Sequence, residues 1–214
     1  MNHKIFISSL IFLFINCNSF NKKIYVEDID GNIYPYTKIG TIYWLQENLK
    51  TEHYQNGDKI IYIKNDSQWI NSKFGALCYY NNNINNKHVY GVLYNWYVAS
   101  DNRNVCPIGW EVASRKDFFE LSNFYGGNKI SGQYLKDNND NLWIKPNSPI
   151  VKESKFKSIP SGHRGNIMNV LKTFDRLGFY AFYWTKDDEL TNNCIPDTLG
   201  CAYECSLYGF KLRS

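Results

Sequence analysis

Short runs of Ile, Tyr and Val separated by turn residues dominate the start of the chain, and they constrain its fold more than any other feature. In residues 23–49, Asp30-Gly31-Asn32 divides two such runs, and Gly40 marks a second reversal before residues 42–45. A Gly-containing turn between β-branched and aromatic runs is a strong hairpin signal. We therefore expect strands joined by tight turns at the beginning of the domain.

The composition favours strands and turns over helices. The chain has 214 residues, of which 17% are aromatic, 27 are Asn and only 5 are Ala. Ala is the best helix former, whereas Tyr and Ile favour strands and Asn favours turns. The length suits one domain with a short tail. The net charge of +4 is dispersed, and no basic run interleaves with aromatic residues, so we expect no nucleic-acid partner.

One segment, residues 114–125, carries a clear helix signal. Ser114 is a good N-cap and Asp117 follows three residues later, which is a relative of the capping box. Gly126 and Gly127 then end the segment. The apolar residues at helical spacing are Phe118, Leu121, Phe124 and Tyr125. We assign these side chains to the core.

The remaining segments add strands and loops. Residues 59–64 predict a strand, residues 90–100 predict either a buried strand or a short helix, and residues 179–185 and 203–213 predict late strands. The chain between the helix and the late strands reads as loop-rich. The fold class predicted is therefore α+β, a β-rich domain with one clear helix and long loops.

The first residues are typical of an export signal. A basic start at residues 1–4 precedes eleven uncharged residues, 5–15, and then Asn16 and Cys17. An apolar run of this length matches a signal-peptide core and is too short to span a bilayer of about 30 Å. A Cys directly after such a run is typical of a bacterial lipoprotein, in which Cys17 would carry the lipid.

The predicted organisation follows from that cleavage. Residues 1–16 form the lipoprotein signal peptide, residues 17–23 a short tether, and residues 24–214 a single domain. An ordinary secretory signal cleaved nearby and an uncleaved anchor are the alternatives. No other stretch is long and apolar enough to span a membrane. We expect an exported protein held to the cell envelope by a lipid, on the periplasmic or the surface face of the outer membrane.

The cysteines are candidates for disulfides. If Cys17 carries lipid, five remain, and an odd number leaves at least one thiol free or intermolecular. An exported location makes disulfides plausible. The disulfide candidates are Cys78, Cys106, Cys194, Cys201 and Cys205.

Metal and cofactor chemistry find little support in the sequence. Asp28 to Asn32 superficially resembles a calcium loop, but an EF-hand needs Gly where Ile33 stands and Glu where Ile39 stands. Cys201 and Cys205 lack a second ligand pair at zinc-finger spacing. No His is marked by its position as the base for a catalytic thiol. We expect no metal, no cofactor and no catalytic residues.

Nine segments, in order, resemble the Fibrobacter succinogenes major paralogous domain. The sharpest is Cys106-Pro107-x-Gly109-Trp110-x-Val112-x-Ser114, which leads into the expected helix. The full set is 30–34, 39–49, 54–57, 78–81, 90–97, 106–114, 159–164, 183–185 and 209–213. The resemblance covers about residues 24–214.

The resemblance carries its own expectations. Proteins of this family are exported or lipid-anchored in Fibrobacter and Bacteroidetes-type bacteria, and their fold is thought to be related to C-type lectin-like domains, whose first and last strands pair. Cys78 and Cys106 match family cysteines, which implies a disulfide between them. The sugar-binding signatures of true C-type lectins are absent, so calcium-dependent sugar binding does not follow.

Three residues are candidates for ligand contact. Trp69 and Trp143 lie in loop-like segments, and aromatic faces stack well on sugar rings. Arg164 either clamps an anionic ligand or pairs with a buried carboxylate such as Glu47, and the structural pair is favoured. The leading hypothesis is a non-catalytic, lectin-like domain that binds a surface glycan or an envelope protein.

Two alternatives come from other classes of protein. The first is a structural or assembly component of the envelope that has no small ligand. The second is an enzyme related to formylglycine-generating enzymes, which are built on a related fold. Such enzymes need a reactive cysteine pair, and no matching motif is present, so this hypothesis rests on fold analogy alone.

Overall fold

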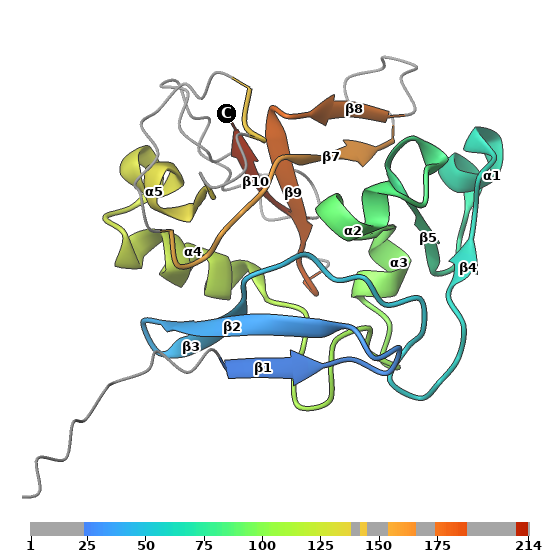
Figure 1. Cartoon of the computed structure of the whole chain (residues 1–214), viewed down its shortest axis with the longest axis horizontal. Coiled ribbons are helices and arrows are strands. Elements are labelled where there is room, and N and C mark those ends of the chain that lie inside the picture. The colour runs from blue at the N-terminus through green and yellow to red at the C-terminus, as the bar shows by residue number, and fades with distance from the viewer. Residues whose placement is uncertain (1–23, 138–141, 145–153, 166–173, 188–208, 214) are drawn as a thin grey trace, which may run out of the picture.

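The computed structural model describes residues 24–137, 142–144, 154–165 and 174–187, and the backbone of 209–213. These residues form three small sheets and several short helices, as an α+β chain should (Figure 1). The strands are β1 (Ile24–Glu27), β2 (Ile33–Ile39), β3 (Ile42–Leu45), β4 (Ile61–Tyr62), β5 (Ala76–Cys78), β6 (Leu93–Tyr94), β7 (Ser161–Arg164), β8 (Phe174–Leu177), β9 (Tyr180–Trp184) and β10 (Gly209–Arg213). The helices are α1 (Asp66–Asn71), the 3₁₀ turn η1 (Tyr80–Asn82), α2 (Asn86–Tyr90), α3 (Trp96–Ala99), α4 (Arg115–Phe124) and α5 (Asn128–Leu135).

The first sheet confirms the hairpins expected from the sequence. Strands β1, β2 and β3 pair antiparallel in that order. Gly31 and Gly40 occupy the two turns with φ of 81° and 63°, a left-handed conformation that glycine adopts without strain. The Asp28 carboxylate accepts hydrogen bonds from the N–H groups of Asp30 and Asn32, both at 2.9 Å. Asp28 to Asn32 is therefore a turn, as predicted.

The other two sheets are mixed. β4 pairs parallel with β5, which pairs antiparallel with β6. The last sheet has the order β10-β9-β7-β8. β1 and β10 thus lie in different sheets, so the pairing of first and last strands implied by the family resemblance is not present among the described strands.

Helix α4 confirms the predicted helix and the burial of Phe118 and Leu121, but Phe124 is exposed, so its assignment to the core is wrong. Ser114 caps it, since its hydroxyl accepts from the N–H of Asp117 at 3.1 Å, and the Asp117 carboxylate accepts in return from the Ser114 N–H at 2.7 Å. Gly126 and Gly127 follow with φ of 87° and 89°. The expectation of a single clear helix is wrong, because α5 begins at Asn128 directly after this turn. Its weak signal, with Gly132 inside and no N-cap side chain, explains why sequence reasoning missed it.

The ambiguous segment 90–100 contains both elements that the sequence allowed. It provides the short strand β6 and then helix α3. The strand predicted at 59–64 is shorter than expected, since only Ile61 and Tyr62 pair with β5. Of the last predicted strand, 209–213 is β10, and 203–208 lies outside the described residues.

Two main clusters of buried side chains hold the sheets and helices together. The first joins β2 and β3 to α4, α5 and β9; its members include Ile39, Trp44, Phe118, Leu121, Leu135 and Ala181. The second lies around β5 and α3 and includes Tyr54, Ile60, Leu77, Val98 and Cys106. In Figure 1 the first sheet lies below, the β7–β10 sheet above, and α4 and α5 to one side. Within the part of the chain described, no helix is long and apolar enough to cross a membrane.

Candidate functional site

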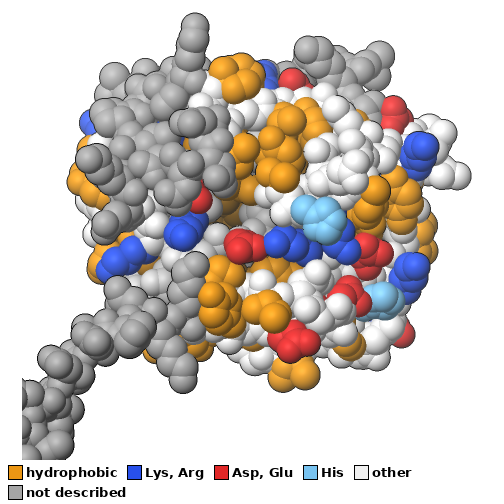
Figure 2. All heavy atoms as spheres, viewed as in Figure 1, with side chains coloured by type: hydrophobic (Ala, Val, Ile, Leu, Met, Phe, Trp, Pro, Cys, Tyr) orange, Lys and Arg blue, Asp and Glu red, His pale blue; other side chains and the backbone are white. Residues whose placement is uncertain are grey.

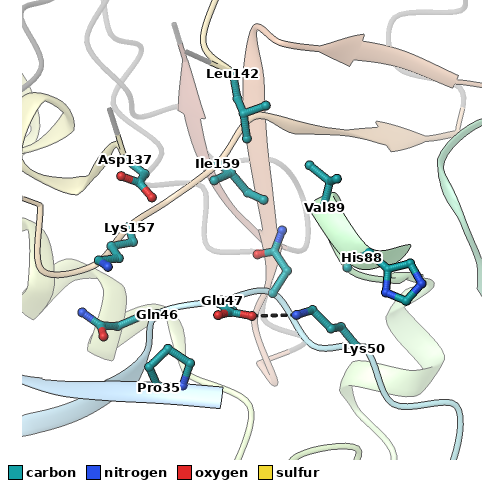
Figure 3. Close-up of a pocket in the computed structure, with 12 residues that line it drawn as sticks. Pro35, Gln46, Glu47, Lys50, His88, Val89, Asp137, Leu142, Lys157 and Ile159 are labelled. Carbon is teal, nitrogen blue, oxygen red and sulfur yellow. Dashed lines mark hydrogen bonds and ion pairs between the residues drawn. The ribbon is translucent and has the colours of Figure 1, made fainter. Parts of the chain in front are cut away.

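A polar pocket opens between the segment that follows β3, helix α2 and the chain around residues 137 and 157–159 (Figure 3). Its volume is about 430 Å³, within the range of about 300 to 1,000 Å³ of small-molecule sites. The polar side chains that line it are Gln46, Glu47, Asn48, Lys50, His88, Asp137 and Lys157. The apolar wall comes from Pro35, Val89, Leu142 and Ile159.

Hydrogen bonds to distant segments fix the backbone of residues 46–50. The N–H of Gln46 donates to the carbonyl of Pro35 at 2.9 Å, and its side-chain amide donates to the carbonyl of Lys155 at 2.8 Å. The side-chain amide of Asn48 donates to the carbonyl of Tyr90 at 2.9 Å. Both amides are thereby oriented by their N–H groups, and neither bond uses the amide oxygen.

Gly91 lets helix α2 end directly against this segment. Its φ is 76°, and a Cβ at this position would lie 2.6 Å from the Cβ of Asn48 and 2.8 Å from the carbonyl oxygen of Leu49. No L side chain fits there without moving the backbone. The close approach places Asn48 and His88 on the same pocket.

Glu47 and Lys50 form an ion pair at the centre of the pocket (Figure 3). Their Oε2 and Nζ atoms are 2.6 Å apart, and both side chains are partly exposed. A pair this accessible to water contributes about 0 to 1 kcal/mol to stability. A ligand can therefore separate the two charges at little cost to the fold.

The opposite wall carries Asp137 and Lys157, which Figure 3 shows on the side away from His88. The N–H of Asp137 donates to the carbonyl of Ser158 at 2.8 Å, and the N–H of Lys157 donates to the hydroxyl of Ser154 at 3.0 Å. Lys157 has a φ of 56°, a left-handed conformation that a lysine seldom adopts. Strain of this kind concentrates at functional sites.

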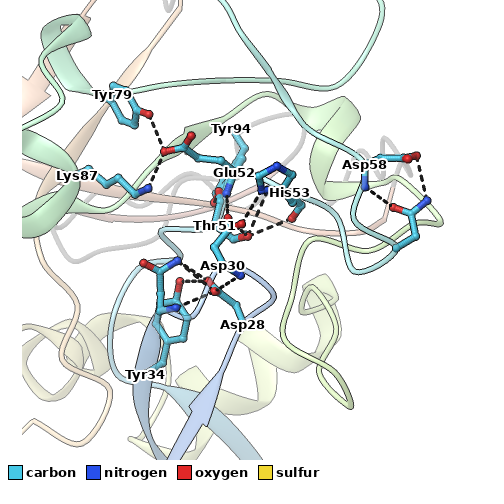
Figure 4. Close-up of polar contacts among 12 residues, drawn as sticks. Asp28, Asp30, Tyr34, Thr51, Glu52, His53, Asp58, Tyr79, Lys87 and Tyr94 are labelled. Atoms are coloured by element: carbon cyan, nitrogen blue, oxygen red, sulfur yellow. Dashed lines mark hydrogen bonds and ion pairs between the residues drawn. The ribbon is translucent and has the colours of Figure 1, made fainter.

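A buried tyrosine links the backbone of Lys50 to the turn of the first hairpin, and Figure 4 shows its contact with Asp28. Tyr34 is fully buried; its hydroxyl donates to Asp28 at 2.5 Å and accepts from the N–H of Lys50 at 2.8 Å. Burial, followed by the hydrogen bond to the Asp28 carboxylate, holds the pKa of Tyr34 far above its ordinary value. The phenol stays neutral and fixes the backbone from which Lys50 projects.

A second set of polar contacts holds the next residues of the chain in place (Figure 4). The Asp30 carboxylate accepts from the hydroxyl of Thr51 at 2.8 Å and the N–H of Glu52 at 2.5 Å, and it pairs with the His53 ring at 2.5 Å. Burial pushes the pKa of Asp30 upward, but these bonds outweigh burial and leave the pKa below its ordinary value.

Glu52 extends this set of contacts to helix α2. It accepts from Lys87 at 2.6 Å and from the hydroxyl of Tyr79 at 2.8 Å. Burial raises the pKa of Glu52, and the bonds from Lys87 and Tyr79 more than compensate, so the pKa is lowered. The turn of the first hairpin, the chain after the pocket and α2 are thus joined through carboxylates.

The structure places Trp69 and Trp143 in the interior, so the interpretation of both as ligand contacts is wrong. Trp69 is 8% exposed and Trp143 is 6% exposed. The Trp143 indole N–H donates to the carbonyl of Ser158 at 3.1 Å. Trp143 therefore supports the pocket wall from behind, and a sugar cannot reach either ring.

Arg164 is structural, as favoured, but its partner differs from the one suggested. Its buried guanidinium donates to the Asp66 carboxylate at 2.7 Å and to the carbonyls of Ile63 and Lys64. It also lies 4.8 Å from the centre of the Trp69 ring. Glu47 is instead paired with Lys50. These contacts leave Arg164 enclosed, so it does not clamp a ligand.

The Cys78–Cys106 disulfide expected from the family resemblance is not formed. Both are free, buried cysteines, and each belongs to a different buried cluster. Burial raises the pKa of the Cys78 thiol to about 11 and that of Cys106 to about 12. The remaining candidates Cys17, Cys194, Cys201 and Cys205 lie outside the described residues.

Sequence reasoning missed the pocket residues because they are far apart in the chain. Glu47 and Asn48 belong to a family-like segment whose apolar residues indicate packing, and His88 follows a polar loop. No local spacing connects them to Lys157 more than sixty residues later. Among the described residues, no three His, Cys, Asp or Glu side chains form a group that could hold a metal ion.

Comparisons with known proteins give one result. The family model described as the Fibrobacter succinogenes major domain matches residues 37–202. This range contains every pocket residue except Pro35. No curated protein and no solved structure matches the chain.

Proposed function

The chain belongs to the Fibrobacter succinogenes major domain family, and on that premise we propose that it is a cell-envelope lipoprotein whose non-catalytic, lectin-like domain binds a surface glycan. The observation that carries the proposal is the polar pocket, in which charged and amide side chains stand on a backbone fixed from several sides. A site of this kind binds by hydrogen bonds that are already oriented before the ligand arrives.

The chemistry of the pocket suits a polyhydroxylated ligand. Glu47 and Asp137 supply acceptors, and Lys50 and Lys157 supply donors. Sugar hydroxyls both donate and accept, so such a mixture can satisfy them, while the apolar wall can contact ring C–H groups. The acidic and basic groups are balanced in number, which favours a glycan over a strongly anionic polymer such as nucleic acid.

The two cysteines in the described part of the chain, Cys78 and Cys106, support a role without covalent catalysis. A reactive thiol needs a lowered pKa, whereas burial raises the pKa of Cys78 and of Cys106. Neither thiol therefore has the properties that the formylglycine-generating hypothesis requires. A binding domain needs no reactive thiol, so both can act as core side chains.

The binding proposal is tested by a screen of the full-length protein, purified in detergent, against bacterial cell-wall and plant polysaccharides. We expect saturable binding to at least one of them, with no requirement for added calcium. The absence of binding to every glycan would contradict the proposed function.

The lipid anchor has its own test. Labelling of producing cells with a tagged fatty acid should mark the wild-type protein and leave the Cys17→Ser variant unmarked, because that thiol is the proposed acceptor. An equally labelled Cys17→Ser variant would place the lipid elsewhere, and an unlabelled wild-type protein would exclude the anchor.

A second candidate function, a structural component of the envelope, is favoured by one observation. Helix α4 exposes Phe119 and Phe124, and α5 exposes Ile130. Exposed apolar side chains can contribute to protein contacts. A photo-crosslinker at Phe119 in living cells should then capture a defined neighbour, and such a result combined with no glycan binding would favour assembly over recognition.

A further inference from the structure

Strand β1 brings an exposed tyrosine next to the pocket. Tyr25 lies directly opposite Pro35 in the β1–β2 pairing, and Pro35 lines the pocket. Directly opposite residues of antiparallel strands project from the same face, with Cβ atoms about 4.5 to 5.5 Å apart. Tyr25 is 51% exposed. Its ring therefore stands on the pocket side of the sheet, one strand further out.

The same face continues beyond Tyr25. Ile33 is two residues from Pro35 along β2 and is also exposed, and Glu27 lies opposite it. The space-filling view shows hydrophobic side chains directly below the row of charged side chains that crosses this face (Figure 2). Pro35, which lines the pocket and pairs with Tyr25, therefore joins the pocket to the exposed side chains of the first two strands.

We infer that the Tyr25 ring is a second subsite for the glycan that the pocket binds, so that the ligand is a chain of sugars whose neighbouring rings occupy the pocket and Tyr25. This inference rests on the proposed function. A pyranose ring has apolar C–H faces and polar edges, which suits an aromatic face beside hydrogen-bonding side chains. Tyr25 supplies the accessible ring that Trp69 and Trp143 do not.

A matched residue separates this role from ordinary surface exposure. Tyr43 in β3 is also 51% exposed. It lies opposite Lys38, which is three residues from Pro35 along β2; because this separation is odd, Tyr43 projects from the other face of the same sheet. Replacing either tyrosine removes the same exposed ring from the same sheet, but only Tyr25 stands beside the pocket.

The experiment measures binding of β-1,4-linked glucose, xylose and mannose oligosaccharides, one to six rings long, to the full-length protein in detergent. For the oligosaccharide series that binds, Tyr25→Ala should lower the affinity for the six-ring ligand about three- to tenfold, the range expected for one aromatic contact. The one-ring ligand should bind unchanged. Tyr25→Trp should keep the wild-type affinity for the six-ring ligand, and Tyr43→Ala should bind that ligand as tightly as the wild type does.

Three results would overturn the inference, and they are distinguishable. If the wild type binds the six-ring ligand and Tyr25→Ala and Tyr43→Ala bind it equally well, Tyr25 is not a subsite, while the proposed function still stands. Unchanged glycan binding combined with weaker sedimentation of Tyr25→Ala with phosphatidylglycerol vesicles would assign this face to the membrane. If the wild type binds none of the oligosaccharides, both the proposed function and the Tyr25 subsite are contradicted.

Discussion

Arg164 and Lys50 are both basic side chains paired with a carboxylate, yet they occupy opposite environments. Arg164 is enclosed; its guanidinium contacts Asp66 and two backbone carbonyls and stacks on Trp69. Lys50 is partly exposed, and its ammonium contacts Glu47 at the centre of a pocket. A charge enclosed by several fixed partners stabilises the fold, whereas an accessible charge with a replaceable partner can contribute to recognition.

Replacement of Arg164 should reduce stability more than any other change considered. Arg164→Met should lower the free energy of unfolding by about 3 to 5 kcal/mol, because it leaves the carbonyls of Ile63 and Lys64 without their donor. Lys50→Met should cost less than about 1 kcal/mol. Urea unfolding of both variants measures the contrast, and equal losses would contradict the distinction between the two charges.

Gly91 tests how tightly the pocket segment is built. Gly91→Ala should cost about 2 to 4 kcal/mol, because it adds a clash with Asn48 and Leu49 to the strain of a left-handed φ. Gly57 has a φ of 89°, and a Cβ added there would meet no atom within 4 Å, so Gly57→Ala should cost only the strain, about 1 to 2 kcal/mol. Denaturant midpoints compare the two, and a smaller effect at Gly91 would mean that α2 can move away.

Tyr34 connects the two kinds of region, since its buried hydroxyl fixes the backbone of Lys50. Tyr34→Phe should lower the free energy of unfolding by about 1 to 3 kcal/mol, because Asp28 loses a hydrogen bond and the Lys50 N–H loses its acceptor. Tyr43→Phe, at an exposed position, should change it by less than about 0.5 kcal/mol. Unfolding titrations with indistinguishable midpoints would show that the Tyr34 hydroxyl does not hold this segment.

The smallest effect concerns pH. The pKa values of Asp30 and Glu52 are lowered in the folded state. Their contribution to the free energy of unfolding is therefore complete when the pH is above their unfolded-state pKa values of about 3.9 and 4.3. It is lost as the pH falls through the lower folded-state values, because protons then bind the folded form as well. Stability should therefore fall in acid, and Asp30→Asn with Glu52→Gln should reduce that fall. Thermal unfolding between neutral and acidic pH measures it, and Glu120→Gln on exposed α4 is the control.

The local features of the fold were predictable because they depend on neighbouring residues. The Ser114 cap with Asp117, the turns at Gly31 and Gly40, and the early strands each need only a few adjacent side chains. Helix α5 was missed because its own signal is weak and because it follows the turn at Gly127 without a capping side chain. Its burial against the first cluster, through Leu135, compensates for that weakness.

The site was harder to predict than the fold. The aromatic faces of Trp69 and Trp143 suggest ligand contact, but burial depends on the whole chain and not on the residue type. The pocket combines residues that lie as far apart in the chain as Pro35 and Ile159. Such a set becomes visible only when the sheet, α2 and the 157–159 segment are placed together.

The most direct test of the pocket compares two ion pairs of the same chemistry in glycan binding. Glu47→Gln with Lys50→Met removes the pair inside the pocket, and Glu120→Gln with Lys116→Met removes the exposed pair of α4, whose charged atoms are 3.7 Å apart. We predict that affinity for the polysaccharide identified in the screen falls at least about tenfold, or about 1.4 kcal/mol, in the pocket variant and stays at the wild-type value in the α4 variant. Equal affinities in the two variants would contradict the assignment of the pocket as the binding site.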